Sequence, residues 1–285
     1  MNISKSKILS TIAATTLSVV LSLSSASASD RLPTHEELRD ALRDVVGTEI
    51  NGGSGFHFYA VVVDRDGVVR RVVFSGENRG DQFPIARAVV AAKASTVNGL
   101  SLSNFVVSTS QLTSVVQANG VFQDLQDVPK LNDVIYEGPA RLYGTKRDPM
   151  IGHIVGGATS LGGAVALYND DGEVIGGLGI GGESQPCADH VAVWIMRDRF
   201  GLDNLAPGIG GSPTGDDNII HDLDENGVSA SGLGTPECSP LSTELAARLP
   251  FDFPIGPELG AFNAGSPPLL GGSDDDDRDN DRDDD

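Results

Sequence analysis

Hydrophobic residues first repeat at helical spacing shortly after residue 34. Apolar positions fall at 38, 41, 42, 45 and 46 and so form one stripe along a helix. Thr34 is followed three residues later by Glu37, which is the spacing of a capping box, and Gly47 follows the last apolar position. The pattern predicts a helix over residues 35–46.

Two later regions have the pattern of β-hairpins. Strand-forming residues occupy 56–63 and 68–74 on either side of an Asp-Arg-Asp-Gly turn. The same arrangement returns at 164–168 and 173–180, where the turn reads Asn-Asp-Asp-Gly. The sequence therefore predicts two antiparallel hairpins about 100 residues apart in the chain.

A helix is expected after each hairpin. Pro84 opens an Ala-rich segment that predicts a helix over 85–98, ended by Gly99, and a further helix is expected over 188–200. A shorter helix is plausible at 110–118. Hairpins followed by helices indicate an α/β protein of the α+β class, with a single antiparallel sheet of about five strands and helices packed on it.

The remaining segments are expected to be less regular. Residues 120–147 lack periodicity and are expected to cover a pocket or an interface. Residues 206–272 are rich in Gly, Pro, Asn and Asp, which predicts an irregular extension tied to a domain at 29–205 and no second domain. Nine Asp and two Arg follow Ser273, and this charge predicts an unfolded, solvated tail over 273–285, with loose cation binding as the alternative.

The first 28 residues have the three parts of a secretory signal peptide. Lys5 and Lys7 precede an apolar run over 8–23, and a small-residue site follows at Ala26 to Ala28. A membrane anchor is less favoured, because the run is short for the roughly 20 residues that a bilayer crossing needs. We expect cleavage after Ala28 and a periplasmic or secreted protein that does not span the membrane.

The amino-acid composition limits the classes of function that are expected for this protein. The 285 residues include 20 Lys and Arg against 40 Asp and Glu, so the formal net charge is −20. Nucleic-acid binding through a basic surface is therefore not expected. The 39% of hydrophobic residues are sufficient for a folded core.

The two cysteines, Cys187 and Cys238, enclose a stretch of about fifty residues. An oxidising compartment lets such a pair persist as a disulfide, which would stabilise the fold by roughly 3–4 kcal/mol in the chain-entropy model. A redox pair or a metal thiolate site is the alternative, but no Cys-x-x-Cys spacing supports either. The sequence favours a structural disulfide.

Three segments together resemble the GlcG/HbpS-like haem-binding family, which includes the C-terminal domain of PduO-type proteins. Residues 61–67 are similar to its Val-Val-Asp-x-x-Gly hairpin, and residues 85–96 to its Ile-Ala-x-x-Lys-Ala-x-Thr helix. Residues 162–182, followed by Asp189, are similar to its glycine-rich motif and the Asp behind it. The resemblance covers about residues 35–200.

The sequence also departs from the family pattern. Ala164 and Val165 stand where a Pro-Ile pair is usual, and Ile180 with Gly181 replaces Val-Ser. The resemblance implies a pocket for haem or a related planar tetrapyrrole. A helix N-terminus beside the glycine-rich strand end, at Gly181 and Gly182, is expected to hold an anion such as a propionate.

The iron ligand cannot be carried over from the family, because axial ligation varies within it. His153, just before the glycine-rich motif, and His190, beside Asp189, are the candidate haem and metal ligands. For both, a structural, hydrogen-bonded histidine is the alternative. His35 and His57 are weaker candidates.

Other polar residues complete the expected site. Lys93 lies on an otherwise apolar helix, where it would pair with a haem propionate or another acid, or extend to solvent. Asp189 is expected to cap the following helix. Tyr143 and Arg141 in the irregular middle of the chain, together with Tyr136, could close the pocket.

An acidic turn at 222–227 matches the first half of a calcium loop, but its twelfth position is Leu233 and not the required Glu. We expect a plain turn there, with calcium binding as the alternative. The leading function is an exported haem-binding protein for sequestration, sensing or transfer. Haem degradation or another small-molecule reaction, and an oligomeric interaction module, are the alternatives. The resemblance implies a homo-oligomer.

Overall fold

The computed structural model describes residues 31–118, 120–127 and 129–256 of the chain. The signal peptide expected at 1–28 and the acidic tail expected at 273–285 lie outside these described residues. Both remain predictions.

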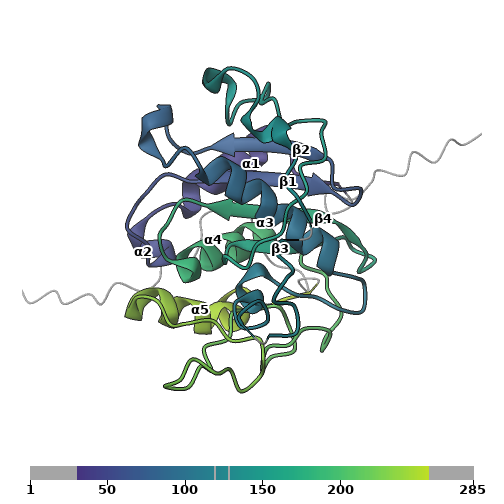
Figure 1. Cartoon of the computed structure of the whole chain (residues 1–285), viewed down its shortest axis with the longest axis vertical. Helices are drawn as coiled ribbons and strands as arrows, with labels where there is room; N and C mark the ends of the chain where they lie inside the picture. Colours follow the sequence, from purple (N-terminus) through teal and green to yellow (C-terminus); the bar gives the residue numbers. More distant parts are fainter. Residues whose placement is uncertain (1–30, 119, 128, 257–285) are drawn as a thin grey trace, which may run out of the picture.

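A four-stranded antiparallel sheet forms the centre of the protein (Figure 1). Its strands are β1 (Tyr59–Asp64), β2 (Val69–Phe74), β3 (Ala164–Tyr168) and β4 (Val174–Gly181), in the order β2-β1-β4-β3. Both predicted hairpins are confirmed, and the pairing of β1 with β4 joins them into one sheet. The expected fold class is also confirmed, with four strands where about five were expected.

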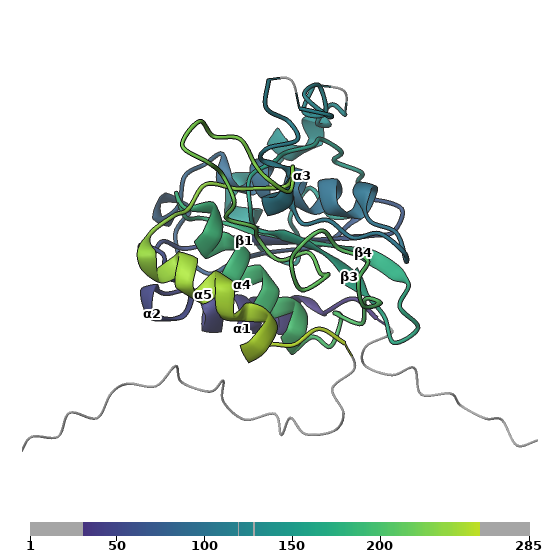
Figure 2. The same ribbon diagram turned by 90° about the horizontal axis from the view of Figure 1, so that it is seen from below.

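Helices cover both faces of this sheet (Figure 2). One face packs against α3 (Ala86–Leu100), and the other against α1 (His35–Val45) and α4 (Pro186–Arg199). The short α2 (Thr48–Asn51) and α5 (Pro240–Asp252) pack against α4. Because both faces are covered, β1, β3 and β4 are almost wholly apolar and do not alternate with polar residues, whereas β2 carries Arg70 and Arg71.

The side chains of β1 show how the two layers are filled. Ala60 and Val62 belong to the core cluster between the sheet and α1 and α4, whereas Val61 and Val63 belong to the cluster beneath α3. Successive residues of a strand point to opposite faces, so a single apolar run supplies both cores.

Glycines in β4 let α3 lie unusually close to the sheet. A Cβ added at Gly177 would stand 2.4 Å from the carbonyl oxygen of Ala94, and one at Gly179 would stand 2.5 Å from that of Val90. Any side chain at these positions would push the helix away from the strand. The glycine-rich sequence of β4 therefore fixes the position of α3.

The boundaries of the main helices are close to those predicted. The capping box at the start of α1 is present, since the Glu37 amide donates to Thr34 Oγ1 at 3.3 Å and the Thr34 amide to the Glu37 carboxylate at 2.7 Å. Helix α3 runs one residue past Gly99, and α4 begins two residues earlier than expected, at Pro186.

The prediction of a helix at 110–118 is wrong. A 3₁₀ helix covers Thr109–Leu112, and turns follow it. Its polar side chains bind other segments: Thr109 Oγ1 accepts from the Ala164 amide, and Gln111 Nε2 donates to the Asn218 carbonyl. These tertiary hydrogen bonds hold the segment in place and compete with a continuous helix.

The extension after Gly201 packs into the main core and contains α5, which the sequence analysis missed. Ile219, Leu245 and Leu249 belong to the same core cluster as β1 and α4. The disulfide between Cys187 and Cys238, predicted from the sequence, is confirmed and joins the first turn of α4 to the segment before α5. None of the helices in the described ranges has the length and hydrophobicity that a bilayer crossing needs.

Candidate functional site

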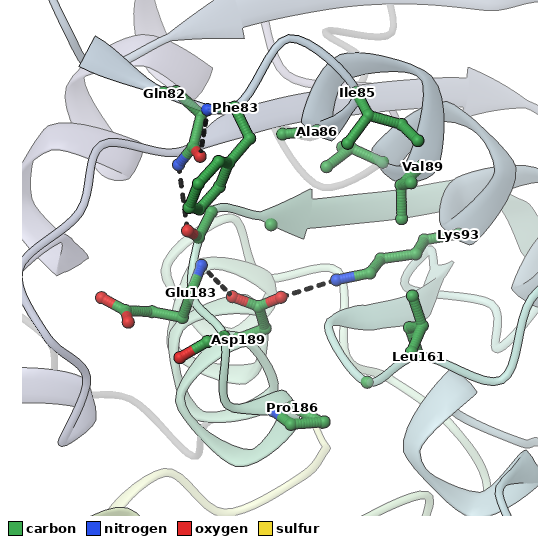
Figure 3. A pocket seen from close by; sticks show the side chains of 15 residues that line it. Gln82, Phe83, Ile85, Ala86, Val89, Lys93, Leu161, Glu183, Pro186 and Asp189 are labelled. Atoms are coloured by element: carbon green, nitrogen blue, oxygen red, sulfur yellow. Dashed lines mark hydrogen bonds and ion pairs between the residues drawn. The ribbon is translucent and has the colours of Figure 1, made fainter.

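A hollow of about 230 Å³ lies at the end of β4, beside Gly182 (Figure 3). We call it the glycine hollow. It is bounded by Gly181, Gly182 and Gly162, by the first turns of α3 and by the start of α4. Its apolar lining residues are Phe83, Ile85, Ala86, Val89, Val90, Leu161 and Pro186.

The glycines create this space. A Cβ at Gly181 would stand 2.9 Å from Lys93 Nζ, and one at Gly182 would stand 2.4 Å from the carbonyl oxygen of His57. A side chain at either position would fill the hollow or displace its wall. The predicted binding residues Gly181 and Gly182 are therefore brought together with Lys93 at one place.

Lys93 and Asp189 form a buried ion pair at the base of the hollow. Lys93 Nζ lies 2.6 Å from Asp189 Oδ2, and both side chains are 4% exposed. The ammonium also donates to the Ile180 carbonyl at 3.0 Å, and Asp189 Oδ1 accepts from the Glu183 amide at 3.3 Å (Figure 3). Of the two roles considered for Lys93, pairing with an acid is the one observed, and the acid is part of the protein.

Asp189 does not cap α4, contrary to the sequence-based expectation. Helix α4 starts at Pro186, with Gln185 before it, so Asp189 lies one turn inside the helix. From there its carboxylate turns toward Lys93 and Glu183. Burial raises the pKa of Asp189 to about 6, although the ammonium of Lys93 acts to lower it. At neutral pH the carboxylate is ionised and the pair is intact.

Large apolar side chains on the wall of the hollow are open to solvent. Phe83 is 56% exposed, Ile85 66% and Leu161 50%. Clustered exposure of this kind marks a binding surface more often than isolated exposed residues do. The glycine hollow thus combines an apolar wall with a charged base.

His190 lies behind the hollow and is not part of its lining. It is fully buried, with Nδ1 3.0 Å from Ser110 Oγ and Nε2 3.1 Å from Asn218 Oδ1. Burial lowers the pKa of His190 to about 4, so the ring is neutral at pH 7. Both ring nitrogens already have partners, which is the arrangement of a structural histidine.

His153 lies elsewhere. It is exposed in a turn beside β2, where its carbonyl accepts from the Val69 amide at 2.9 Å. The structure therefore does not bring His153 or His190 to the wall of the glycine hollow. Haem ligation by either stays a prediction that this arrangement does not favour.

Gln82 is a lining residue that the sequence analysis missed. It is 6% exposed, and its Nε2 donates to the Gly182 carbonyl at 3.0 Å and also to the carbonyl of His57. It thereby holds the end of β4 against the start of β1. No periodic pattern points to Gln82, because it lies in an irregular segment before α3.

The lining residues are suited to contact the edge of a tetrapyrrole, but they are not suited to bind its iron. None of the 15 residues lining the hollow is His, Tyr, Cys or Met, the usual protein ligands of haem iron. The volume is also below the roughly 300–1,000 Å³ of sites that enclose a whole ligand. The hollow fits an apolar edge with an acidic group, and most of a macrocycle would stay outside it.

The acidic turn at 222–227 is a self-contained loop. Asp224 Oδ1 accepts from the amides of Asn226 and Val228, and Asp222 accepts from Ser229 Oγ and the Ser231 amide. In the part of the chain that the structure describes, no group of three or more His, Cys, Asp or Glu side chains could hold a metal ion.

Comparisons with known proteins give structural matches only. No family model matches the chain, and no curated protein does. Solved structures that match include the Klebsiella pneumoniae protein ORFY, of the DUF336 family model, at 19% identity over 59% of this chain and 90% of that one, with a TM-score of 0.39.

Two further solved structures match the chain, and one of them contains haem. A PduOC–haem complex matches at 20% identity over 58% of this chain and 92% of that one, with a TM-score of 0.39. HbpS matches at 19% identity over 63% and 95%, with a TM-score of 0.37. These proteins belong to the group that the sequence motifs resemble. At this level of likeness they assign no role to any residue of this chain.

Proposed function

We propose that the protein binds a flat, largely apolar small molecule with an acidic group, and that haem or a related tetrapyrrole is the leading candidate. The observation that supports this is the glycine hollow, an apolar recess with a buried lysine at its base. The family resemblance supplies the tetrapyrrole as a ligand class, and the hollow supplies a suitable place for its edge.

Lys93 would anchor the acidic group. An ammonium has three N–H donors, and two of them are used by Asp189 and the Ile180 carbonyl. Lys93 and Gly181 both line the hollow, and because Gly181 has no side chain, a ligand carboxylate that enters the hollow would meet Nζ directly. The third donor can then form a charge-assisted hydrogen bond.

The exposed walls would hold the flat part of the ligand. Phe83 and Leu161 approach the recess from opposite sides in Figure 3, and each would lose contact with water when an apolar ring lies between them. A haem held in this way would bring its iron chemistry with it, but the lining residues would contribute only anchoring and exclusion of water.

We also propose that the protein acts outside the cytoplasm, in the periplasm or as a secreted protein. The support is the signal-peptide pattern of residues 1–28 together with a disulfide, which persists in oxidising compartments. Self-association, which the family resemblance implies, is part of the same proposal.

The proposal is tested by titrating the purified protein with hemin and with metal-free protoporphyrin, following the Soret band. Both should bind saturably with affinities within about threefold of each other, because no iron ligand lines the hollow. Leu161→Glu should weaken both by about tenfold, since it puts a negative charge beside the ligand acid.

Leu241→Glu is the matched control, because Leu241 is 45% exposed on α5 and does not line the hollow. It should leave both affinities unchanged. Binding of hemin alone, with a spectrum that changes in a His153 or His190 variant, would move the site away from the glycine hollow. Saturable binding of neither compound would refute the proposed function.

A further inference from the structure

A second and larger cleft lies between the start of α1, the segment after β2 and residues 139–147. Its volume is about 890 Å³, and it shares no lining residue with the glycine hollow. We call it the basic cleft. Its floor is formed by Tyr59 and Phe74, and its rim by charged side chains from all three segments.

The charge of this cleft is opposite to that of the whole protein. Its acidic lining residues are Glu36 and Glu77, so the local formal charge is 6 − 2 = +4 in a chain with a net charge of −20. Six of the 20 Lys and Arg side chains of the chain meet here. They are Arg39, Arg43, Arg79, Arg141, Lys146 and Arg147.

The protein neutralises only part of this charge. Lys146 pairs with Glu36, Arg43 Nη2 lies 3.0 Å from Glu77 Oε1, and Arg39 Nε lies 3.7 Å from Asp40 Oδ1. Among the described residues, Arg79, Arg141 and Arg147 have no carboxylate within ion-pair distance. Their mutual repulsion would be relieved by an anion between them.

One lining residue of the cleft, His35, has a buried polar atom without a partner. His35 is only 8% exposed and lines the cleft, and its Nδ1 has no hydrogen-bond partner. Burial lowers the pKa of His35, with further lowering by Arg39, Lys146 and Arg71 against the raising effect of Glu36. Unsatisfied buried polar atoms are rare in native proteins and point to an absent partner.

The aromatic floor is held rigidly. The rings of Tyr59 and Phe74 stack with their centroids 4.4 Å apart, and the guanidinium of Arg87 lies 3.8 Å from the ring centroid of Tyr143. Arg87 is itself fixed by a buried ion pair with Asp148. The cleft thus has a fixed aromatic base and an exposed cationic rim.

We propose that the basic cleft binds a small organic polyanion with two or more phosphate or carboxylate groups. The planar guanidinium groups of Arg79, Arg141 and Arg147 would contact the oxyanions, because their donor forks match phosphate and carboxylate geometry. The stacked rings of Tyr59 and Phe74 would support the uncharged part of the ligand.

The test is isothermal titration of the full chain with inorganic triphosphate at low ionic strength. Saturable one-to-one binding is expected, and it should weaken as salt is added. Arg141→Glu combined with Arg147→Glu should weaken binding at least tenfold. Lys130→Glu with Arg248→Glu makes the same charge change outside the cleft and should alter binding less than twofold.

The acidic residues at 274–285 are themselves a polyanion and could compete with triphosphate for the cleft. A full-length variant with Asn at 274–277 controls for this competition. Tighter triphosphate binding in that variant supports the basic cleft as an anion site. Equal weakening of triphosphate binding in the two Glu double variants would show a nonspecific charge effect and overturn the proposal. Absence of saturable binding in both the native protein and the Asn variant would also overturn it.

Competition with protoporphyrin separates this proposal from the proposed function. Triphosphate and protoporphyrin should bind at the same time, because the two sites share no residue. If each displaces the other and Arg141→Glu with Arg147→Glu removes both, the basic cleft is the tetrapyrrole site, and a separate polyanion site is overturned.

Discussion

The glycine hollow and the basic cleft use cationic side chains in opposite ways. In the hollow, the single ammonium of Lys93 is buried and already paired with Asp189 inside the protein. In the cleft, Arg79, Arg141 and Arg147 are exposed, and among the described residues no carboxylate lies within ion-pair distance of them. Breaking a buried pair destabilises the fold strongly, whereas exposed charges contribute little to stability and can be changed at low cost.

The largest effect expected from this contrast is on stability. Lys93→Met removes the partner of a buried carboxylate, so the free energy of unfolding should fall by about 3–5 kcal/mol, as measured by urea denaturation. The double variant Lys93→Met with Asp189→Asn should recover most of the loss, because no unpaired buried charge is left.

Arg141→Glu with Arg147→Glu is the comparison in the cleft, and its free energy of unfolding should change by less than about 0.5 kcal/mol. A large loss in this variant, or none in Lys93→Met, would contradict the distinction between the two regions.

The second prediction concerns His190, buried behind the hollow. Its pKa is about 4 in the folded protein and about 6.5 in an unfolded chain, so only the unfolded state binds a proton between these values. The free energy of unfolding should fall by about 3 kcal/mol from this group as the pH drops from 7 to 4. This loss is measured by chemical denaturation of the native protein and of the His190→Gln variant at several pH values.

Asp189 changes the free energy of unfolding with pH in the opposite direction. Its pKa is raised to about 6, so the stability linked to it is present below pH 3.8 and is lost as the pH rises through 6. Only the difference between the native protein and His190→Gln therefore isolates His190. Parallel pH curves for these two proteins would show that His190 is not the group responsible.

The smallest predicted effect is on ligand affinity. When Asp189 is protonated below about pH 6, Lys93 loses its competing anion and should hold a ligand carboxylate more tightly. Protoporphyrin affinity should therefore rise up to about tenfold between pH 7.5 and pH 5.5. Asp189→Asn should bind tightly at both pH values, and weaker binding of the native protein at pH 5.5 would contradict the anchoring role of Lys93.

Much of the fold was predictable because its signals are local. The capping box at Thr34, the two turn sequences and the apolar runs each depend on neighbouring residues, and all of them gave the correct elements. The segment at 110–118 was not predictable, because contacts with residues far away in the chain override its local helical preference. Helix α5 was missed among turn-forming residues, although Ser239 and Pro240 are helix-start signals.

The candidate site was only partly predictable. Gly181, Gly182 and Lys93 were selected from the sequence and lie together, because a strand and a helix that pack through glycines bring them into contact. His153 and His190 were selected for their chemistry and lie elsewhere, since chemical type says nothing about which way a side chain points. Gln82 had no sequence signal, because it lies in an irregular segment. Arg141 was selected from the sequence, but the cationic rim as a whole was not predictable, because it is assembled from α1, the segment after β2 and residues 139–147.

The sequence by itself determined the sheet, its main helices, the disulfide and the overall acidity, because hydrophobic periodicity, turn residues and charge act over short stretches. Only the tertiary structure decided that Lys93 pairs with Asp189, that His190 is satisfied by Ser110 and Asn218, and that a basic cleft exists at all. These features depend on distances between residues up to about a hundred positions apart, and such distances are fixed only when the whole core packs.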